Sequence, residues 1–260
     1  MARYISTSPF SAVNCASAIT RTLRGHGFLR RVSSLHDGVL DCLFPRVCVG
    51  CGKIGDYICA RCAAHLPVLD GPLCPRCGQP QASGMLCPSC AAKLSPVSSI
   101  RSVFRFEGVV RNAVYELKYH NLRAIVPTLA AYLTEYARQR EVVADVIVPV
   151  PLHPQRRRRR GYNQSELLAR ALAQSLAAPV SINSLKRTGG QASQVRTRSM
   201  AERLRNVADA FTCTDASFSD KRILLIDDVC TTGATLEACA VALRSAGASD
   251  VLGLTVAREV

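Results

Sequence analysis

The sequence predicts an α/β protein in which helices flank a parallel sheet, preceded by a small cysteine-rich region. From about residue 100, short β-branched runs alternate with longer stretches rich in Ala and Leu, which is typical of βαβ units. Residues 37–95 are instead dense in Cys, Pro and Gly and poor in aliphatic residues. Such a composition cannot supply an adequate hydrophobic core, so something else must hold this region together.

The 260 residues are enough for one large domain or two ordinary ones. The chain has no run of roughly 18 apolar residues, which a membrane helix needs, and its first 30 residues lack the apolar block of a secretory signal. We therefore expect a cytoplasmic protein without a membrane span. Residues 1–36 contain five Arg but no Asp or Glu, which predicts a disordered N-terminal extension. An organelle transit peptide and a start codon upstream of the true one remain alternatives, so whether this segment belongs to the mature protein stays open.

Eight of the 13 cysteines form four CxxC pairs, separated by 7, 11 and 9 residues. A tetrahedral zinc ion needs four thiolates, and one CxxC turn delivers two, so four pairs make two structural sites. Disulfides do not suit a cytoplasmic protein, a redox CxxC would need a thioredoxin-like context, and the even pairing is unusual for an iron–sulfur cluster. The sequence leaves open whether adjacent or interleaved pairs share one zinc. The predicted ligands are Cys48, Cys51, Cys59, Cys62, Cys74, Cys77, Cys87 and Cys90.

The second part of the chain predicts four strands and several helices. A segment at 111–139 predicts one or two helices, with a break near His120 and Asn121 or at Pro127. The expected strands are 145–151, 179–187, 222–229 and 250–258, and two further helices are expected at 163–177 and 233–247.

The positive charge is concentrated in residues 151–206, where twelve Lys and Arg face two acids, a net charge of +10 out of +14 for the chain. A polyanion is the natural partner, either a phosphorylated metabolite or nucleic acid, and a solvated, disordered charge run is the alternative. Within this stretch, residues 188–206 are too polar for a covering helix and too long for an ordinary connection. We expect them to form a functional, mobile segment.

The stretch ILLIDDVCTTGAT, residues 223–235, joins a buried strand to a hydroxyl-rich turn. Ligands of open α/β sheets bind at the carboxyl ends of the strands, where the chain would leave this strand at Asp227 and Asp228. The turn that follows opens a helix, so its backbone N–H groups suit a phosphate monoester. Because carboxylates repel phosphate, the aspartates must face hydroxyls, a metal ion or both. A ribose 5-phosphate unit meets both demands, and an ordinary strand followed by a capped helix is the alternative.

This stretch resembles the phosphoribosyl pyrophosphate (PRPP) signature of type I phosphoribosyltransferases, which is four hydrophobic residues, two acids and a TTG-containing loop. VIVPVPLHPQRRRRRGYNQSELLARALA resembles a segment of one branch of that fold, the ComF (competence protein F-like) family. ELKYHN at 116–121, RLRNVADAF at 203–211 and the CxxC region resemble it too. The resemblance spans residues 37–258. It implies a double zinc ribbon at 37–95 and a type I phosphoribosyltransferase-like domain at 96–260.

The resemblance also implies roles for individual residues. Asp227 and Asp228 would hold the ribose hydroxyls and an associated Mg²⁺ as the catalytic acids. The 5′-phosphate would be cradled by Thr231, Thr232, Gly233, Ala234 and Thr235. The pyrophosphate and the closing loop would be served by Arg159, Arg160, Gly161, Asn163, Gln164, Arg196, Arg198 and Arg203.

Two functions follow as hypotheses. The first is a PRPP-binding protein that transfers a phosphoribosyl group with Mg²⁺, linked to competence and DNA uptake or to nucleotide metabolism, with other competence proteins as partners. The second is a module without enzymatic activity that handles single-stranded DNA through the basic surface of residues 156–205, although aromatic residues, apart from Tyr162, do not interleave with these arginines. The sequence names neither the acceptor substrate nor the oligomeric state.

Overall fold

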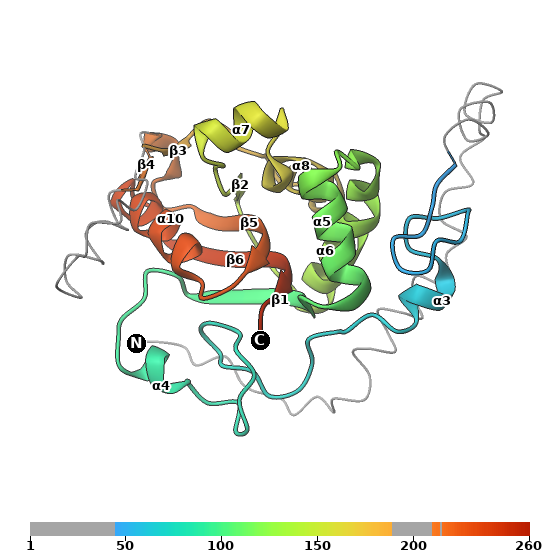
Figure 1. Ribbon diagram of the computed structural model, residues 1–260. Coiled ribbons are helices and arrows are strands. Elements are labelled where there is room, and N and C mark those ends of the chain that lie inside the picture. The colour runs from blue at the N-terminus through green and yellow to red at the C-terminus, as the bar shows by residue number, and fades with distance from the viewer. Residues whose placement is uncertain (1–44, 189–209, 214) are drawn as a thin grey trace, which may run out of the picture.

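The computed structural model describes residues 45–188, 210–213 and 215–260, and the predicted N-terminal extension lies outside them. Its main sheet has four parallel strands in the order β1-β6-β5-β2 (Figure 1). These strands are β1 (Ser99–Arg105), β2 (Val146–Pro149), β5 (Arg222–Cys230) and β6 (Asp250–Arg258). A separate antiparallel pair consists of β3 (Leu185–Arg187) and β4 (Phe211–Cys213). The helices are α3 (Ala60–Ala63), α4 (Pro88–Ala91), α5 (Gly108–Tyr119), α6 (Val126–Gln139), α7 (Pro154–Arg160), α8 (Gln164–Leu176) and α10 (Ala234–Ser245), with 3₁₀ turns η1 (Arg123–Ile125) and η2 (Ala216–Phe218).

Helices cover both faces of the main sheet, and β5 lies inside it between β2 and β6 (Figure 1). Successive side chains of a strand point to opposite faces, so the aliphatic run of β5 divides in two. Leu224 and Ile226 pack with buried residues of α5, α6 and α8, while Ile223 and Leu225 pack with buried residues of α10 and the β3–β4 pair. The predicted fold class, a parallel sheet flanked by helices, is confirmed.

Two strands differ from the prediction. β1, which the sequence did not predict, forms one edge of the main sheet against β6. The expected strand at 179–187 gives the main sheet only a single bridge, Val180 to Ile147, before β3 turns to pair with β4. Polar residues interrupt that run, and the Ser184 hydroxyl hydrogen bonds to the Asp215 carboxylate at 2.6 Å instead of joining a core.

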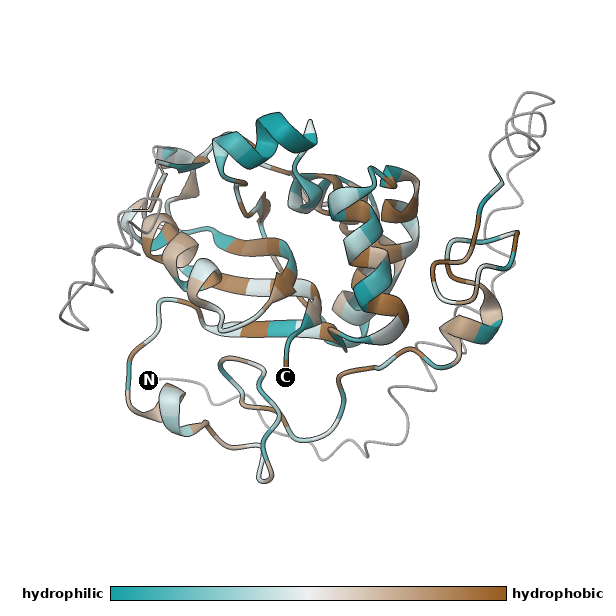
Figure 2. Cartoon of the chain, viewed as in Figure 1, coloured by the Kyte–Doolittle hydropathy of each residue, from teal (hydrophilic) through white to brown (hydrophobic). Residues whose placement is uncertain are grey.

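The helices begin and end largely at local signals. α5 ends at Tyr119, and Asn121 has a φ of 59°, so the break falls at the first of the two places that the sequence indicated. The arginine run, for which a solvated, disordered stretch was the alternative to an anion-binding segment, is the helix α7, which stands out as hydrophilic along its length (Figure 2). Pro154 occupies its first turn and Gly161, at φ 80°, ends it.

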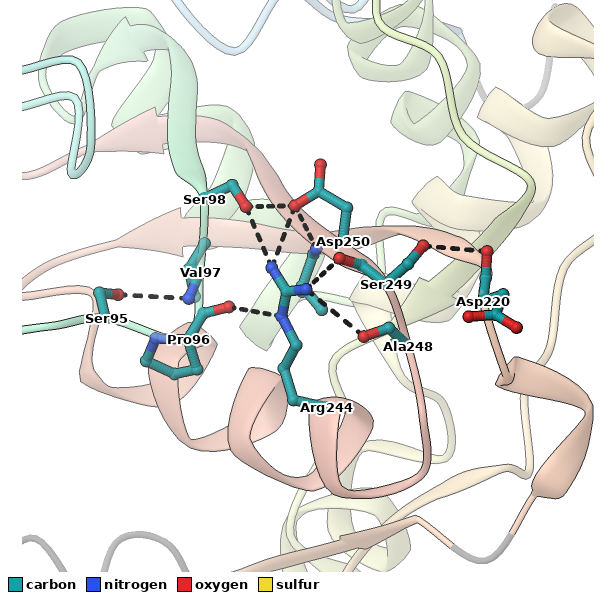
Figure 3. Close-up of polar contacts among 10 residues, drawn as sticks. Ser95, Pro96, Val97, Ser98, Asp220, Arg244, Ala248, Ser249 and Asp250 are labelled. Atoms are coloured by element: carbon teal, nitrogen blue, oxygen red, sulfur yellow. Dashed lines mark hydrogen bonds and ion pairs between the residues drawn. The ribbon is translucent and has the colours of Figure 1, made fainter. Parts of the chain in front are cut away.

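The junction between the cysteine region and β1 is fixed by Arg244, near the end of α10 (Figure 3). Its guanidinium donates to the Pro96 carbonyl at 3.1 Å and forms an ion pair with Asp250 at 3.1 Å. It also donates to the Ser98 hydroxyl at 3.1 Å. One side chain therefore joins the segment entering β1 to the start of β6. Among the described residues, no helix has the length and apolar character needed to cross a membrane.

Candidate functional site

The two adjacent aspartates lie within the last part of β5, which continues to Cys230 and so does not end at the acids as the sequence suggested. Asp227 accepts a hydrogen bond from the Ser165 hydroxyl in the first turn of α8, at 2.8 Å. Asp228 is 3% exposed, and its Oδ2 lies 2.5 Å from Nζ of Lys118 in the last turn of α5. Both carboxylates thus contact residues on the α5 and α8 side of the sheet.

The two acids have different electrostatic environments. Burial, together with the charge of Asp228, raises the pKa of Asp227 to about 7, against the Ser165 hydrogen bond, which lowers it. Asp228 is compensated by the Lys118 ammonium. A cation that arrives at this pair would favour the fully ionised form of Asp227. The pair is therefore suited to bind positive charge or hydroxyl donors.

The five residues predicted to hold phosphate lie together at the start of α10, a helix of 12 residues. Thr231, Thr232, Ala234 and Thr235 are exposed, while Gly233 is buried with a φ of 83°. A Cβ at Gly233 would approach Cδ1 of Ile100 to 3.0 Å, so the turn lies tightly against β1. Free backbone N–H groups in the first turn of a helix favour an anion, and here they have exposed hydroxyls beside them.

A pocket of about 460 Å³ lies between the end of α5 and α7. Four of its lining residues are cationic and none is acidic, so it too is suited to an anion. The lining residues are Lys118, Tyr119, Asn121, Arg156, Arg159, Arg160 and Tyr162. Lys118 is shared between this pocket and the acid pair.

The predicted pyrophosphate residues divide into two groups. Arg159 and Arg160 line the basic pocket, and the Arg160 guanidinium hydrogen bonds to the Gln164 side chain. Asn163 is buried and structural: its Oδ1 accepts from the Ser165 N–H at 3.1 Å to cap α8, and its Nδ2 donates to a carbonyl of the chain after β2. Gly161 and Gln164 do not line the pocket.

The segment predicted to close over the site lies in the chain between β3 and β4, and these two strands lie next to α10 in Figure 1. The backbone of Thr188, at its start, donates to the Ala210 carbonyl at 3.1 Å. The predicted loop residues Arg196, Arg198 and Arg203 lie outside the described residues.

The structure brings adjacent CxxC pairs together in two clusters, and within each the four sulfurs lie within 4.8 Å of one another. Cluster 1 is Cys48, Cys51, Cys59 and Cys62, and cluster 2 is Cys74, Cys77, Cys87 and Cys90. Four thiolates about 2.3 Å from one zinc ion stand about 3.8 Å apart in a tetrahedron. The Sγ atoms of Cys51 and Cys59 are 3.6 Å apart and those of Cys77 and Cys87 are 3.7 Å apart, so the donor set fits zinc.

Backbone amides prepare these sulfurs for a metal. The N–H of Cys59 donates to Sγ of Cys48 at 3.3 Å, and the N–H of Cys87 donates to Sγ of Cys74 at 3.4 Å. Burial alone would raise the pKa of Cys48 and Cys74, but hydrogen bonds from backbone amides lower both values to about 6. Deprotonated thiols are the form that binds zinc.

A buried arginine connects cluster 2 with the phosphate turn. Arg258, at the end of β6, is 2% exposed and donates to the Gln79 side-chain oxygen at 3.0 and 3.1 Å, two residues after Cys77. It also donates to Sγ of Cys230 at 2.9 Å, immediately before Thr231. The cation is buried between the cysteine cluster and the turn that would hold phosphate.

Sequence reasoning missed three residues that the structure brings to the site: Lys118, Ser165 and Arg258. Lys118 and Ser165 contact the predicted acids from distant parts of the chain, 62 residues away for Ser165 and Asp227, and Arg258 contacts Cys230 just before the predicted phosphate turn. Lys118 and Ser165 had a signal, because they lie in the two segments, ELKYHN and VIVPVPLHPQRRRRRGYNQSELLARALA, that resemble the ComF family. Arg258 had none.

The chain matches the models of two known domain families. A double zinc ribbon domain model matches residues 39–91, and a phosphoribosyl transferase domain model matches residues 163–258. Together with the two clusters of four cysteines, the match to the double zinc ribbon domain supports structural zinc.

Curated relatives match over most of their length. The DNA utilization protein YhgH of Escherichia coli (strain K12) is 31% identical, covering 81% of this chain and 93% of that protein. Competence protein ComFC of Bacillus subtilis is 27% identical over 80% of this chain and 86% of that protein. Competence protein F of Haemophilus influenzae is 29% identical over 75% of this chain and 94% of its own. The chain therefore belongs to the ComF family, with a double zinc ribbon followed by a phosphoribosyltransferase domain.

Proposed function

We propose that this protein binds PRPP or a closely related phosphorylated ribose and transfers its phosphoribosyl group with Mg²⁺. The observation that carries the proposal is the arrangement of three sites: a phosphate turn at the start of α10, an acid pair just before it, and a basic pocket that shares Lys118 with the acids. PRPP carries a 5′-phosphate, a ribose diol and a diphosphate, which require three such sites.

The donor set fits Mg²⁺. The hard oxygen ligands that this ion prefers are available from Asp227, Asp228 and the Ser165 hydroxyl. In the proposed complex these acids would hold Mg²⁺ and the ribose hydroxyls. When bound, the ion would neutralise part of the charge that develops on the leaving diphosphate.

The chain's own residues would perform the remaining work. The N–H groups and hydroxyls from Thr231 to Thr235 would fix the 5′-phosphate. Arg159 and Arg160 would stabilise the diphosphate as the bond from C1′ breaks. The acids would hold the ribose so that C1′ faces its nucleophile, and the acceptor would supply the electron pair for the new bond.

Calorimetric titration of the full chain with PRPP and Mg²⁺ tests the proposal. Binding should disappear in Asp228→Asn and persist in Asp70→Asn, which alters an exposed aspartate of the cysteine region. Melting curves without ligand would show whether the variants are folded. Failure of the wild-type protein to bind at millimolar PRPP would contradict the proposal.

The names of the relatives suggest where such an activity would serve. Two of them are called competence proteins and a third a DNA utilization protein. We propose a role linked to DNA uptake or to the use of its nucleotides, in the cytoplasm and together with other competence proteins. A deletion strain that loses transformation or growth on DNA, and regains it with the wild-type gene but not with the Asp228→Asn gene, would support that role.

A second candidate function, binding of single-stranded DNA, is favoured by one observation. The sequence showed few aromatic residues among the arginines, but the structure brings the exposed Tyr119, at the end of α5, beside α7, with the exposed Tyr115 next to it. Tyr115 and Tyr119 are 51% and 61% exposed with ring centroids 4.7 Å apart, and the Arg160 guanidinium lies 5.6 Å from the Tyr119 ring. Exposed aromatic rings beside cations suit unpaired bases and phosphates.

Fluorescence anisotropy with a labelled oligonucleotide tests this second function. Arg156→Glu/Arg158→Glu should weaken binding and reduce its salt dependence, by about 0.7 in the logarithmic slope for each lost phosphate contact. The control Arg138→Glu/Arg140→Glu makes the same charge change at the end of α6. Equal effects of the two double variants, or no binding at low salt, would argue against this function.

A further inference from the structure

Lys118 contacts two regions of opposite charge. Its ammonium lies 2.5 Å from Asp228, and its side chain also lines the basic pocket beside α7. The Lys118 side chain is 21% exposed and that of Asp228 is 4% exposed, so the ion pair is largely withdrawn from water. Among the described residues, Lys118 is the one that both contacts the acid pair and lines the pocket.

This position creates a conflict for any metal ion at the acids. A dication at Asp228 would stand against the ammonium that already occupies the same carboxylate oxygen, and the two would repel each other. The flexible four-carbon stem of lysine allows the ammonium to turn away. The space that it already borders is the pocket, which three arginines also line.

A turn into that pocket is unfavourable while the pocket holds no anion, because four cations would then share about 460 Å³. With a diphosphate in the pocket, the same turn becomes favourable, since the ammonium exchanges one anionic partner for another. The two regions are therefore linked through one side chain.

We propose that Lys118 is a displaceable counter-ion that makes binding of the metal ion at Asp228 depend on binding of the diphosphate in the basic pocket. The inference rests on the proposed function and deepens it. The metal ion alone must push the ammonium into a cationic pocket, whereas the metal and the anion together give each charge a partner. Because coupling free energies are reciprocal, the metal also strengthens binding of the anion.

Titration with Mn²⁺ alone, followed by its electron paramagnetic resonance signal, tests the first half. The ion binds zinc-type thiolate sites more weakly than Zn²⁺ does, so the zinc clusters should not interfere. Lys118→Met keeps the length of the side chain without its charge, and we expect it to bind Mn²⁺ about tenfold more tightly than the wild type, or about 1.4 kcal/mol. Lys118→Arg should stay close to the wild type. Lys221→Met is the matched control at the opposite, amino end of β5.

Titration with PRPP at saturating Mg²⁺ tests the second half. Lys118→Met should bind PRPP about tenfold more weakly while binding the bare metal more tightly. A merely structural role of Lys118 would weaken both or neither. Opposite changes in the affinities for PRPP and for the bare metal ion are therefore expected only if the Lys118 ammonium moves from Asp228 to the diphosphate.

Amine labelling of the wild-type protein, read by mass spectrometry, measures the accessibility of the Lys118 amine and tests the exchange even if Lys118→Met fails to fold. Lys118 should be protected without ligand, protected with Mg²⁺ and PRPP, and more reactive when Mn²⁺ alone is driven to saturation. Unchanged Lys118 reactivity in all three states, or unchanged Mn²⁺ affinity in a folded Lys118→Met, would overturn the inference even if PRPP binds. Absence of PRPP binding in the wild type would instead overturn the proposed function, and with it the diphosphate half of the inference, while the Mn²⁺ titration still decides the exchange at Asp228.

Discussion

The two cysteine clusters share one ligand pattern but are attached to the rest of the protein in different ways. Cluster 1 rests on α5 mainly through apolar contacts: Ile58 and Leu66 are buried in the same core as that helix. Cluster 2 has its own small buried set of cysteines and is joined to the sheet through polar contacts. Its Arg76 carbonyl accepts from the Ile100 N–H at 2.7 Å, and its Gln79 accepts from Arg258.

This difference in attachment implies that the two cysteine clusters have different roles. Apolar contact is non-directional, so cluster 1 can add stability without fixing a particular atom of the site. A hydrogen-bonded cation has a definite position, and Arg258 reaches Cys230 just before the phosphate turn. Cluster 2 should therefore influence ligand binding, and cluster 1 should influence mainly stability.

Loss of one metal ligand in each cluster should have the largest effect. Cys74→Ser should release one zinc, unfold the segment around cluster 2 and weaken PRPP binding at least tenfold, because Gln79 would no longer hold Arg258. Structural zinc contributes about 10–16 kcal/mol of apparent binding energy in small zinc-finger peptides, so the local loss is severe.

Cys48→Ser is the matched variant for cluster 1. It should also release one zinc and lower the melting temperature, but PRPP affinity should stay within about twofold. Zinc content and calorimetry measure both effects. Equal losses of PRPP affinity in the two variants would show that the clusters do not differ in this way.

In each cluster a glycine directly follows the first CxxC pair. Replacing each of these glycines by alanine tests the close approach of cluster 2 to β1. Gly52 and Gly78 have nearly equal φ values, 74° and 72°. A Cβ at Gly52 meets nothing within 4 Å, whereas at Gly78 it would lie 2.5 Å from the Ile100 carbonyl oxygen. Gly52→Ala should cost about 1 kcal/mol from backbone strain, and Gly78→Ala about 3 kcal/mol in total because of the added overlap. Chemical denaturation measures the difference, and equal costs would place the strain in the turn alone.

Removal of the acceptor for Arg258 tests the polar link itself. Gln79→Leu leaves a buried guanidinium short of an acceptor and should cost about 2 kcal/mol in the free energy of unfolding. Gln81→Leu is the control, since the Gln81 side chain donates to the carbonyl of the preceding residue and not to β6. We expect the control to change stability by less than about 0.5 kcal/mol. A similar cost for both variants would mean that Arg258 does not depend on Gln79.

The smallest expected difference between the two clusters is in the rate at which each loses its zinc. Cys51 of cluster 1 is exposed, whereas three of the four cysteines of cluster 2 are buried and the fourth is intermediate. A chelator should therefore remove zinc from cluster 1 first. Native mass spectrometry with alkylation of the freed thiols would identify the cluster, and earlier alkylation of Cys74 or Cys77 would reverse the assignment.

The sequence predicted those features that local patterns encode. The CxxC pairs, the aliphatic run of β5 and the helix start at Gly233 each rest on neighbouring residues. The helix α7 also had local signals, Pro154 at its start and Gly161 at its end, although five like charges in a row repel one another at i,i+4 spacing. In the structure, Glu166 offsets part of this repulsion through an ion pair with Arg157 at 3.2 Å.

The features that the sequence did not predict depend on long-range contacts. The partners of the two acids, Lys118 and Ser165, come from helices on one side of the sheet. Gln79 and Arg258 are 179 residues apart. Edge strand β1 was missed for a related reason: its pattern is mixed, and only its pairing with β6 defines it. Periodicity describes one element at a time and gives no information about which elements meet.

The strand order has a consequence for how the protein folds during synthesis. β1 pairs along its length with β6, from Ser99 opposite Leu252 to Arg105 opposite Arg258. During translation, the cysteine clusters can bind metal as soon as residues 48–90 have left the ribosome, but β1 has no strand partner in the main sheet until residues 250–258 follow it. Pairings between such distant segments form slowly. The metal clusters would therefore be the first ordered parts of the newborn chain, and the site that they border would be among the last.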